Sequence, residues 1–292
     1  MKPFGSFLPA SVILLAVMAA GAAQPVDDPA PAKSRYNLFN PVPDALLREL
    51  SPDRPDKTES PYTVDAGHYQ LEMDFANYTY HKSDGITTKA WNIAPLNLKA
   101  GLLDNVDLQV VFDNYLNVRT ARSAPGGITT QSGVGDLTAR LKINLWGNDG
   151  GRTAFALLPY VSFPTATDGL GDQAVEGGVI FPFAVKLPRG FDLGLETACS
   201  CLRDDNDSNY HADFINSITL GHNLIGKLDG YLEFFSDISS ENHSGWVGTV
   251  RSCRVAGNKM AGRRGRASAP ADAGLGTNIL KGGGLHADEP GA

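Results

Sequence analysis

Residues 137–146 read LTARLKINLW, a stretch in which apolar and polar side chains alternate at every position up to Leu145. Leu137, Ala139, Leu141, Ile143 and Leu145 fall on one face, and Thr138, Arg140, Lys142 and Asn144 fall on the other. A period of two is typical of a β-strand, because its successive side chains point to opposite faces of the sheet. Similar alternation recurs in residues 69–75, 96–102, 106–113, 179–187, 191–195 and 228–237. No helical period of comparable length occurs, so the sequence predicts an all-β chain.

The connections between these strands alternate in length. Short turn sequences lie at 104–105, 146–151, 188–190 and 223–227, whereas longer polar loops lie at about 82–88, 117–134, 164–177, 203–210 and 239–245. The strands between them run for roughly 10–15 residues, whereas globular strands average about 5–6 and a tilted bilayer crossing needs about 9–11. This layout is typical of outer-membrane proteins. We therefore expect a transmembrane antiparallel up-and-down β-barrel over residues 66–250, with nine strands and the start of a tenth.

The charged residues of these strands predict which face meets lipid. A Lys or Arg facing lipid at mid-membrane costs about 2–4 kcal/mol. We therefore expect Lys99, Arg140 and Lys142 to face a wet lumen and the apolar rows to face lipid. Aromatic residues near the strand ends are expected to form interfacial girdles: Tyr78, Tyr80, Trp91, Tyr115, Trp146, Tyr160, Tyr210 and Trp246. Alternation alone also fits a water-soluble barrel whose apolar rows point inward, and the sequence leaves this alternative open.

The N-terminus has the features of a secretory signal peptide. Lys2 precedes an apolar stretch at 7–20, and the small residues 21–23 resemble a cleavage site. We expect residues 1–23 to be a signal peptide, the alternative being a soluble core helix, and the mature chain to lie in the cell outer membrane. The chain has 32 Asp+Glu against 25 Lys+Arg, a net charge of −7, which argues against general nucleic-acid binding.

Residues 24–65 form a polar, proline-rich lead. Asp44 is a candidate N-cap for one short helical turn through Leu50. The three prolines within 51–62 exclude a regular helix or a central strand there. The mixed charges of this segment are costly in lipid but stable in a wet lumen or at its periplasmic mouth. They predict a strap or partial plug in which Arg54, Asp56, Lys57 and Glu59 pair with lumen residues such as Glu72, Asp74, Arg140 and Lys142. The alternative is that the segment merely anchors the N-terminus.

Three segments resemble one known family. They are Leu50–Glu72 (LSPDRPDKTESPYTVDAGHYQLE), Gly133–Asp136 (GVGD) and Leu157–Thr165 (LLPYVSFPT). The chain resembles the outer-membrane transporters of the phenol-degradation meta-pathway (MetA-pathway) family over about residues 45–250. The resemblance implies a barrel of about twelve strands and passage of small, often aromatic, molecules. Expected partners are outer-membrane lipids, the barrel-assembly machinery and a small-molecule solute; the sequence does not indicate an oligomeric state.

Residues 251–292 depart from that pattern. They contain no Phe, Tyr or Trp, nine glycines, and seven Lys+Arg against three Asp+Glu. The resemblance implies about three further strands and an aromatic final residue. We therefore expect that the C-terminal strands are lost and that the reading frame shifted, or the gene is damaged, near codon 250. The alternative is a genuine basic, glycine-rich disordered tail.

The sequence carries no recognisable catalytic motif. It lacks G-x-S-x-G, H-E-x-x-H and P-loop patterns, and its histidines are scattered. Cys199 and Cys201 share one strand face and are expected to be small apolar fillers. We therefore expect no enzyme, catalytic residue, cofactor or metal site. The predicted function is a passive channel or transporter for small molecules, with hydrophobic or aromatic molecules as candidate solutes. The alternatives are a secreted soluble ligand-binding barrel and a structural surface barrel.

Overall fold

The computed structural model describes residues 33–240 except 55–56, 84, 124–126, 168, 205–207 and 226–227. The expected signal peptide 1–23, Asp56, Trp246 and the tail 251–292 therefore lie outside the described residues. The described chain consists of thirteen strands and two short 3₁₀ turns. In order, they are η1 (Asp44–Leu46), β1 (Tyr69–Met73), β2 (Ala76–Ser83), β3 (Ile86–Ile93), β4 (Leu96–Leu103), β5 (Val106–Phe112), β6 (Tyr115–Arg122), β7 (Ile128–Gly133), β8 (Leu137–Trp146), β9 (Thr153–Phe163), β10 (Glu176–Leu187), η2 (Pro188–Gly190), β11 (Phe191–Arg203), β12 (Tyr210–Ile225) and β13 (Leu228–Ser239).

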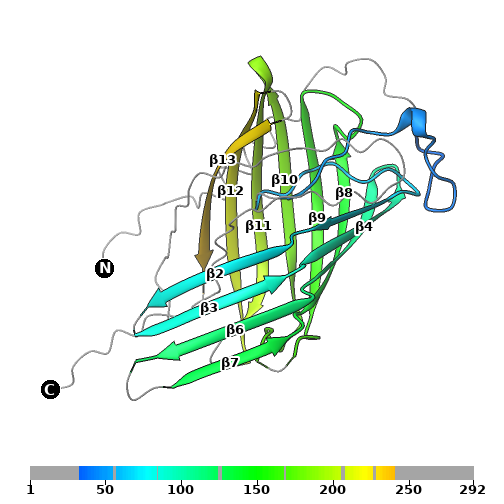
Figure 1. Ribbon diagram of the computed structural model, residues 1–292. Coiled ribbons are helices and arrows are strands. Elements are labelled where there is room, and N and C mark those ends of the chain that lie inside the picture. The colour runs from blue at the N-terminus through cyan, green and yellow to red at the C-terminus, as the bar shows by residue number, and fades with distance from the viewer. Residues whose placement is uncertain are drawn as a thin grey trace, which may run out of the picture.

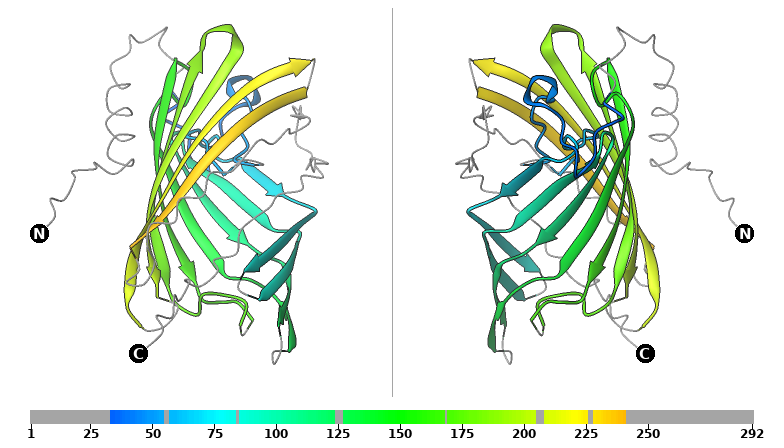
Figure 2. Two further views of the ribbon diagram at one scale, coloured as in Figure 1. Left: turned by 90° about the vertical axis from the view of Figure 1, so that its left-hand side faces the viewer. Right: turned by 90° about the vertical axis from the view of Figure 1, so that its right-hand side faces the viewer.

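The strands form an antiparallel meander, which confirms the predicted all-β fold. One sheet has the order β1-β4-β5-β8-β9-β10-β11-β12-β13, and a second has the order β2-β3-β6-β7. The second sheet continues the first four strands of the first, since β1 leads into β2, β3 into β4, β5 into β6 and β7 into β8. The chain therefore makes nine long antiparallel passes. Figures 1 and 2 show them as one strongly curved wall with the N-terminal segment, in blue, on its concave side.

The predicted barrel is open within the described residues. There, β1 pairs only with β4 and β13 pairs only with β12, so both edge strands keep one side without a sheet partner. The start of a tenth strand, expected near residue 250, lies outside the described residues. No helix of the described chain is long and apolar enough to cross a membrane.

A line of breaks crosses the first four passes at one level. It runs through residues 74–75, 94–95, 113–114 and 134–136. Pro95 has no N–H for a ladder bond and Ala94 has a φ of 52°, so the strand cannot continue regularly there. The breaks interlock: Asp74 N donates to Pro95 O, and Gly135 N donates to Asp113 O at 2.9 Å. Beyond this line, β2, β3, β6 and β7 run at a steep angle to β10–β13 (Figure 1).

The connections follow the predicted alternation, with two corrections. Turns 104–105, 147–152 and 188–190 lie at one rim, and the longer connections 164–175 and 204–209 lie at the other. The predicted loop 117–134 is wrong, because β6 and β7 pair there as a hairpin. The predicted loop 82–88 is instead the tight end of the β2–β3 hairpin. Both segments are polar on both faces, so their strands lack the alternation by which the others were recognised.

Polar side chains are buried on the concave face, and apolar side chains are exposed on the convex face. The buried polar residues include Asn97, Lys99, Asp107, Gln109, Lys142 and Asn144. The opposite faces of these strands carry exposed apolar residues, among them Leu98, Leu108 and Leu145, and β13 carries Phe234. Leu145 and Phe234 are each 50% exposed. This distribution is the reverse of that in a water-soluble barrel. An apolar patch does line part of the concave face, formed by Leu158, Ile180 and Ala198, with Tyr160 and Ile215 packed against it.

Three smaller expectations are wrong. Tyr160 is not an outward girdle residue, because its hydroxyl hydrogen-bonds Ser200 Oγ at 2.6 Å beside the concave apolar patch. Cys199 and Cys201 share one face of β11 as expected, but both are exposed and fill no core. The helical turn predicted from Asp44 to Leu50 is only the 3₁₀ turn η1, whose N-cap is Pro43 rather than Asp44. Leu46 packs against a buried apolar cluster, whereas Leu47 and Leu50 are exposed, so a longer helix would bury little more apolar surface.

Candidate functional site

Residues 33–50 fasten the N-terminal segment to the rim that carries the short turns. Arg48 bonds Asp104 in the β4–β5 turn and Asp149 in the β8–β9 turn, with its Nε donating to Asp149 at 2.8 Å. Lys33 contacts the same Asp149 at 2.6 Å and Asp65 at 3.2 Å. Burial raises the pKa of Asp104 despite its pairing with Arg48. Arg48 thus joins two turns that are far apart in sequence, and Lys33 joins the second of them to Asp65.

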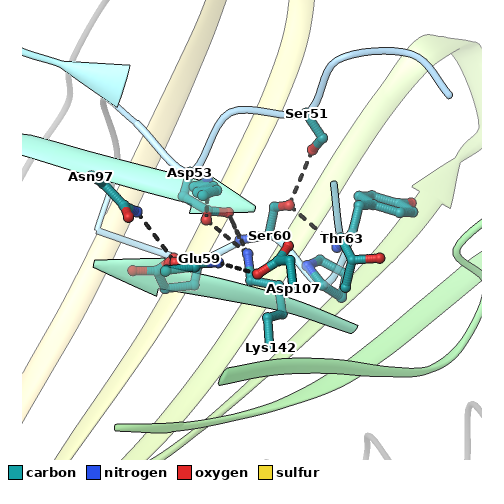
Figure 3. A network of polar contacts seen from close by, with 12 residues as sticks. Ser51, Asp53, Glu59, Ser60, Thr63, Asn97, Asp107 and Lys142 are labelled. Carbon is teal, nitrogen blue, oxygen red and sulfur yellow. Dashed lines mark hydrogen bonds and ion pairs between the residues drawn. The ribbon is translucent and has the colours of Figure 1, made fainter. Parts of the chain in front are cut away.

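Residues 51–62, which we call the strap, continue from this rim along the concave face. Asp53 is the residue of the strap around which a network of polar contacts forms (Figure 3). The Lys142 ammonium donates to both Asp53 carboxylate oxygens, at 2.7 and 2.9 Å, and Lys99 bonds both Asp53 and Glu72. The Asp53 N–H donates to both Glu72 oxygens at 3.2 Å. This cluster joins the strap to β1, β4 and β8.

The electrostatics of Asp53 follow from this geometry. Burial by itself raises the pKa of the carboxyl group, because the charged form loses its hydration. The nearby charges of Lys142 and Lys99, together with their hydrogen bonds, outweigh burial and hold the pKa of Asp53 well below its usual range. The strap is therefore fixed to the strands by an ionised carboxylate between two ammonium groups.

Two further ion pairs join the strap to the strands. Glu59 receives a hydrogen bond from Arg140 Nη1 at 2.5 Å, and its own backbone N–H donates to Glu196 on β11. Arg54 pairs with Asp74, at the line of breaks. Burial raises the pKa of Glu59, with the nearby Asp53 charge acting in the same direction, while Arg140 opposes the shift.

The middle of the strap, at Lys57 and Thr58, contacts the last two described strands. Thr58 Oγ1 lies 2.8 Å from Ser217 Oγ, 2.6 Å from Thr219 Oγ1 and 2.9 Å from Glu233 Oε1. The backbone N–H groups of Lys57 and Thr58 both donate to Glu233. The Lys57 ammonium lies 4.5 Å from the centre of the Phe235 ring. The strap therefore bridges from β1, β4 and β8 to β11, β12 and β13.

Side chains of the sheet hydrogen-bond backbone groups of the strap and of the segment that follows it. Asn144 Nδ2 donates to Pro61 O at 2.8 Å, and just after the strap Val64 N donates to Asp107 Oδ2 at 2.9 Å. An irregular segment with three prolines makes no ladder of its own, so its buried polar groups need such partners. The polar concave face supplies them.

The structure brings most of the sequence-predicted site residues together. Arg54 and Glu59 of the strap meet Asp74 and Arg140, whereas Lys99, Lys142 and Glu72 gather around Asp53. Lys57 contacts Glu233 through its backbone N–H and Phe235 through its ammonium, two residues that were not among the predicted partners. Asp56 lies outside the described residues.

Sequence reasoning missed the hub of the cluster and its far contacts. The missed residues are Asp53, Thr58, Glu196, Ser217, Thr219 and Glu233. Asp53 is two residues before Pro55 in a segment with several charges, and nothing local distinguishes it from Asp56. Ser217 and Thr219 do alternate with apolar Ile218, a pattern that could have placed them on the polar face.

The arrangement attaches the strap to the sheet through ion pairs and hydrogen bonds. Asp53, Glu59 and Glu72 each form an ion pair with a lysine or an arginine. In the described part of the chain, no three His, Cys, Asp or Glu side chains form a group that could hold a metal ion. The cluster instead holds an irregular segment across a curved sheet.

Comparison with known proteins links the chain to one family. Residues 52–252 match the model of the family described as "Putative MetA-pathway of phenol degradation". The match includes nearly the whole strap and all the described strands. A search of curated proteins found no match.

Proposed function

The chain belongs to the MetA-pathway family of phenol degradation, and from this premise we propose that it is an outer-membrane channel for small molecules. The observation that carries the proposal is the reversed polarity of the sheet. Charged Lys99 and Lys142 are almost fully buried on the concave face, while leucines of the same strands are exposed on the convex face. Exposed apolar rows are stable against acyl chains, and buried charges are stable beside a wet, polar interior.

The lengths of the strands support a bilayer crossing. Strands β8 to β13 contain 10 to 16 residues each. A tilted crossing needs about 9–11 residues. Outer-membrane lipids and the barrel-assembly machinery are accordingly the proposed partners, since a polar backbone in lipid requires paired strand edges.

We propose that the strap narrows the channel as a partial plug. It crosses the concave face from β8 to β12 and is held by buried ion pairs. An anchor for the N-terminus alone would need only the rim contacts of Lys33 and Arg48. The deeper contacts of Asp53, Thr58 and Glu59 favour the plug.

The proposed solutes are small, uncharged or cationic molecules with apolar character. The concave patch of Leu158, Ile180 and Ala198 offers apolar surface beside the Tyr160 and Ser200 hydroxyls. The acidic excess of the chain disfavours anions. Passage is passive, so selection depends on the lumen width and its lining rather than on covalent chemistry.

The test is insertion followed by conductance. We expect the purified chain to require detergent, to float with neutral lipid vesicles after an alkaline wash, and to give discrete conductance steps in a planar bilayer. A reversal potential under a salt gradient should show cation preference. A chain that stays soluble without detergent and binds aromatic compounds would instead be a secreted binding barrel. Stable insertion without conductance would identify a structural surface barrel.

A further inference from the structure

The four strands beyond the line of breaks carry only positive charge. Strands β2, β3, β6 and β7 contain Lys82, Lys89, Arg119 and Arg122 and no Asp or Glu. The chain as a whole has a net charge of −7. Asp84, which lies between β2 and β3 in the sequence, is outside the described residues. This concentration of cations at one end of an acidic protein calls for a physical explanation.

Two of these cations lie directly opposite each other. Lys89 on β3 pairs in register with Arg119 on β6, and Tyr80 on β2 occupies the next position in the same row. Directly opposed residues have Cβ atoms about 4.5–5.5 Å apart, and like charges in such positions are destabilising. Lys82 lies diagonally from Lys89 on the same face. We call Tyr80, Lys82, Lys89 and Arg119 the basic row.

The basic row is exposed and makes no ion pair within the described chain. All four side chains are exposed, Tyr80 by 53%. Among the described residues, no salt bridge involves Lys82, Lys89 or Arg119. A like-charge pair across two neighbouring strands, with no counterion among the described residues, is stabilised when an anion bridges it.

The basic row faces outward, next to an aromatic pair. Tyr78 and Trp91 share its face, with ring centres 4.8 Å apart. The alternate residues of these strands point to the concave side. Asn77, one of them, donates to Asp74, which pairs with Arg54 of the strap on that side. From the breaks toward the strand ends, the convex face thus changes from Ile93 and Tyr115 to Trp91 and then to the basic row.

We propose that the basic row binds phosphate groups of outer-leaflet glycolipid, an inference that rests on the proposed membrane location. Aromatic side chains mark the level of the lipid headgroups, and the cations lie one row beyond them. This end is opposite the rim of short turns and the N-terminal segment. In outer-membrane barrels the short turns are periplasmic, so the basic row belongs to the outer leaflet. A phosphate between Lys89 and Arg119 accepts charge-assisted hydrogen bonds from both and removes their repulsion.

The first test compares two forms of one glycolipid. Binding of the purified full chain in neutral detergent to phosphorylated lipid A is measured against binding to dephosphorylated lipid A. We expect a preference of about tenfold or more for the phosphorylated form, since a tenfold ratio needs only ~1.4 kcal/mol. The variant Lys89→Gln/Arg119→Gln should reduce the preference to about twofold or less. The matched control Arg152→Gln/Arg189→Gln, which removes two exposed cations at the opposite rim, should keep it.

A second variant separates loss of binding from loss of folding. Lys89→Glu places a carboxylate opposite Arg119, so the repulsion becomes attraction. We expect an unfolding temperature in detergent at least equal to that of the original chain, together with loss of the phosphate preference. Equal binding of the two lipid A forms by the original chain, or an unchanged preference in either Lys89 variant, would refute the proposal. A chain that floats with neutral vesicles yet shows no preference would overturn this inference alone, whereas failure to insert at all would overturn the proposed function.

Discussion

Asp53 is expected to stabilise the attachment of the strap more than its neighbours do, because both Lys99 and Lys142 contact its carboxylate. Asp53→Ala leaves two buried ammonium groups with too little compensation. Breaking a buried ion pair in this way costs about 3–5 kcal/mol. We expect a loss of that size in the free energy of unfolding, measured by denaturant titration in detergent or vesicles.

Asp74→Ala is the matched control for that substitution. Asp74 and its partner Arg54 are 27% and 28% exposed, so water replaces much of the lost interaction. Exposed pairs contribute only about 0–1 kcal/mol. If the two substitutions lowered the free energy of unfolding equally, the Asp53 cluster would contribute no more to stability than the exposed Arg54–Asp74 pair.

The lowered pKa of Asp53 gives the strap a defined acid response. A carboxyl whose folded pKa is below its unfolded value of about 3.9 contributes stability that is complete above that value and is lost as the pH falls below it. The stability difference between the original chain and Asp53→Asn should therefore be constant from about pH 6 to 8 and shrink below about pH 4. Denaturant titrations at several pH values measure it. A difference that grows on acidification would contradict an ionised, paired Asp53.

At the scale of elements, the strap is the feature most open to a direct test. Removing residues 51–61 should increase single-channel conductance if the strap narrows the channel. Because deletion also leaves Lys99 and Lys142 unpaired, it is best made together with Lys99→Met and Lys142→Met. The control carries Asp53→Asn and the same two lysine substitutions with the strap in place. Equal conductance of the two proteins would show that the strap does not narrow the channel and only anchors the N-terminus.

The line of breaks shows why element boundaries were harder to predict than elements. Alternation in 96–102, 106–113 and 137–145 placed β4, β5 and β8 correctly. Strands β6 and β7 were not predicted, because polar residues lie on both faces of their ladder, with Thr120 and Thr129 on one face and Arg119 and Thr130 on the other. Strands beyond the apolar band no longer need an apolar face, and the period-two signal disappears with it.

For the whole molecule, the open sheet predicts an uneven pattern of amide exchange. β11 is bonded on both sides, to β10 and β12, whereas among the described strands β13 is bonded only to β12. We expect alternate amides of β13, those pointing away from β12, to exchange at least about tenfold faster than amides of β11. Hydrogen exchange followed by mass spectrometry or NMR in detergent measures this ratio. Uniformly slow exchange across β13 would show that another segment or molecule covers this edge.

The sequence by itself determined the strands whose residues alternate in polarity, the alternation of short and long connections, and which side of those strands is polar. These are local properties, because a strand's side-chain period and a turn's residue preferences act over a few neighbouring residues. It also indicated that the charged residues within 54–59 form ion pairs with charged residues of the strands. The tertiary structure alone decided that Asp53 is the hub, that Thr58 reaches β12 and β13, and that Lys89 faces Arg119. Those contacts join residues 46, 89 and 175 positions apart, or different hairpins, and depend on register and curvature that no single segment encodes.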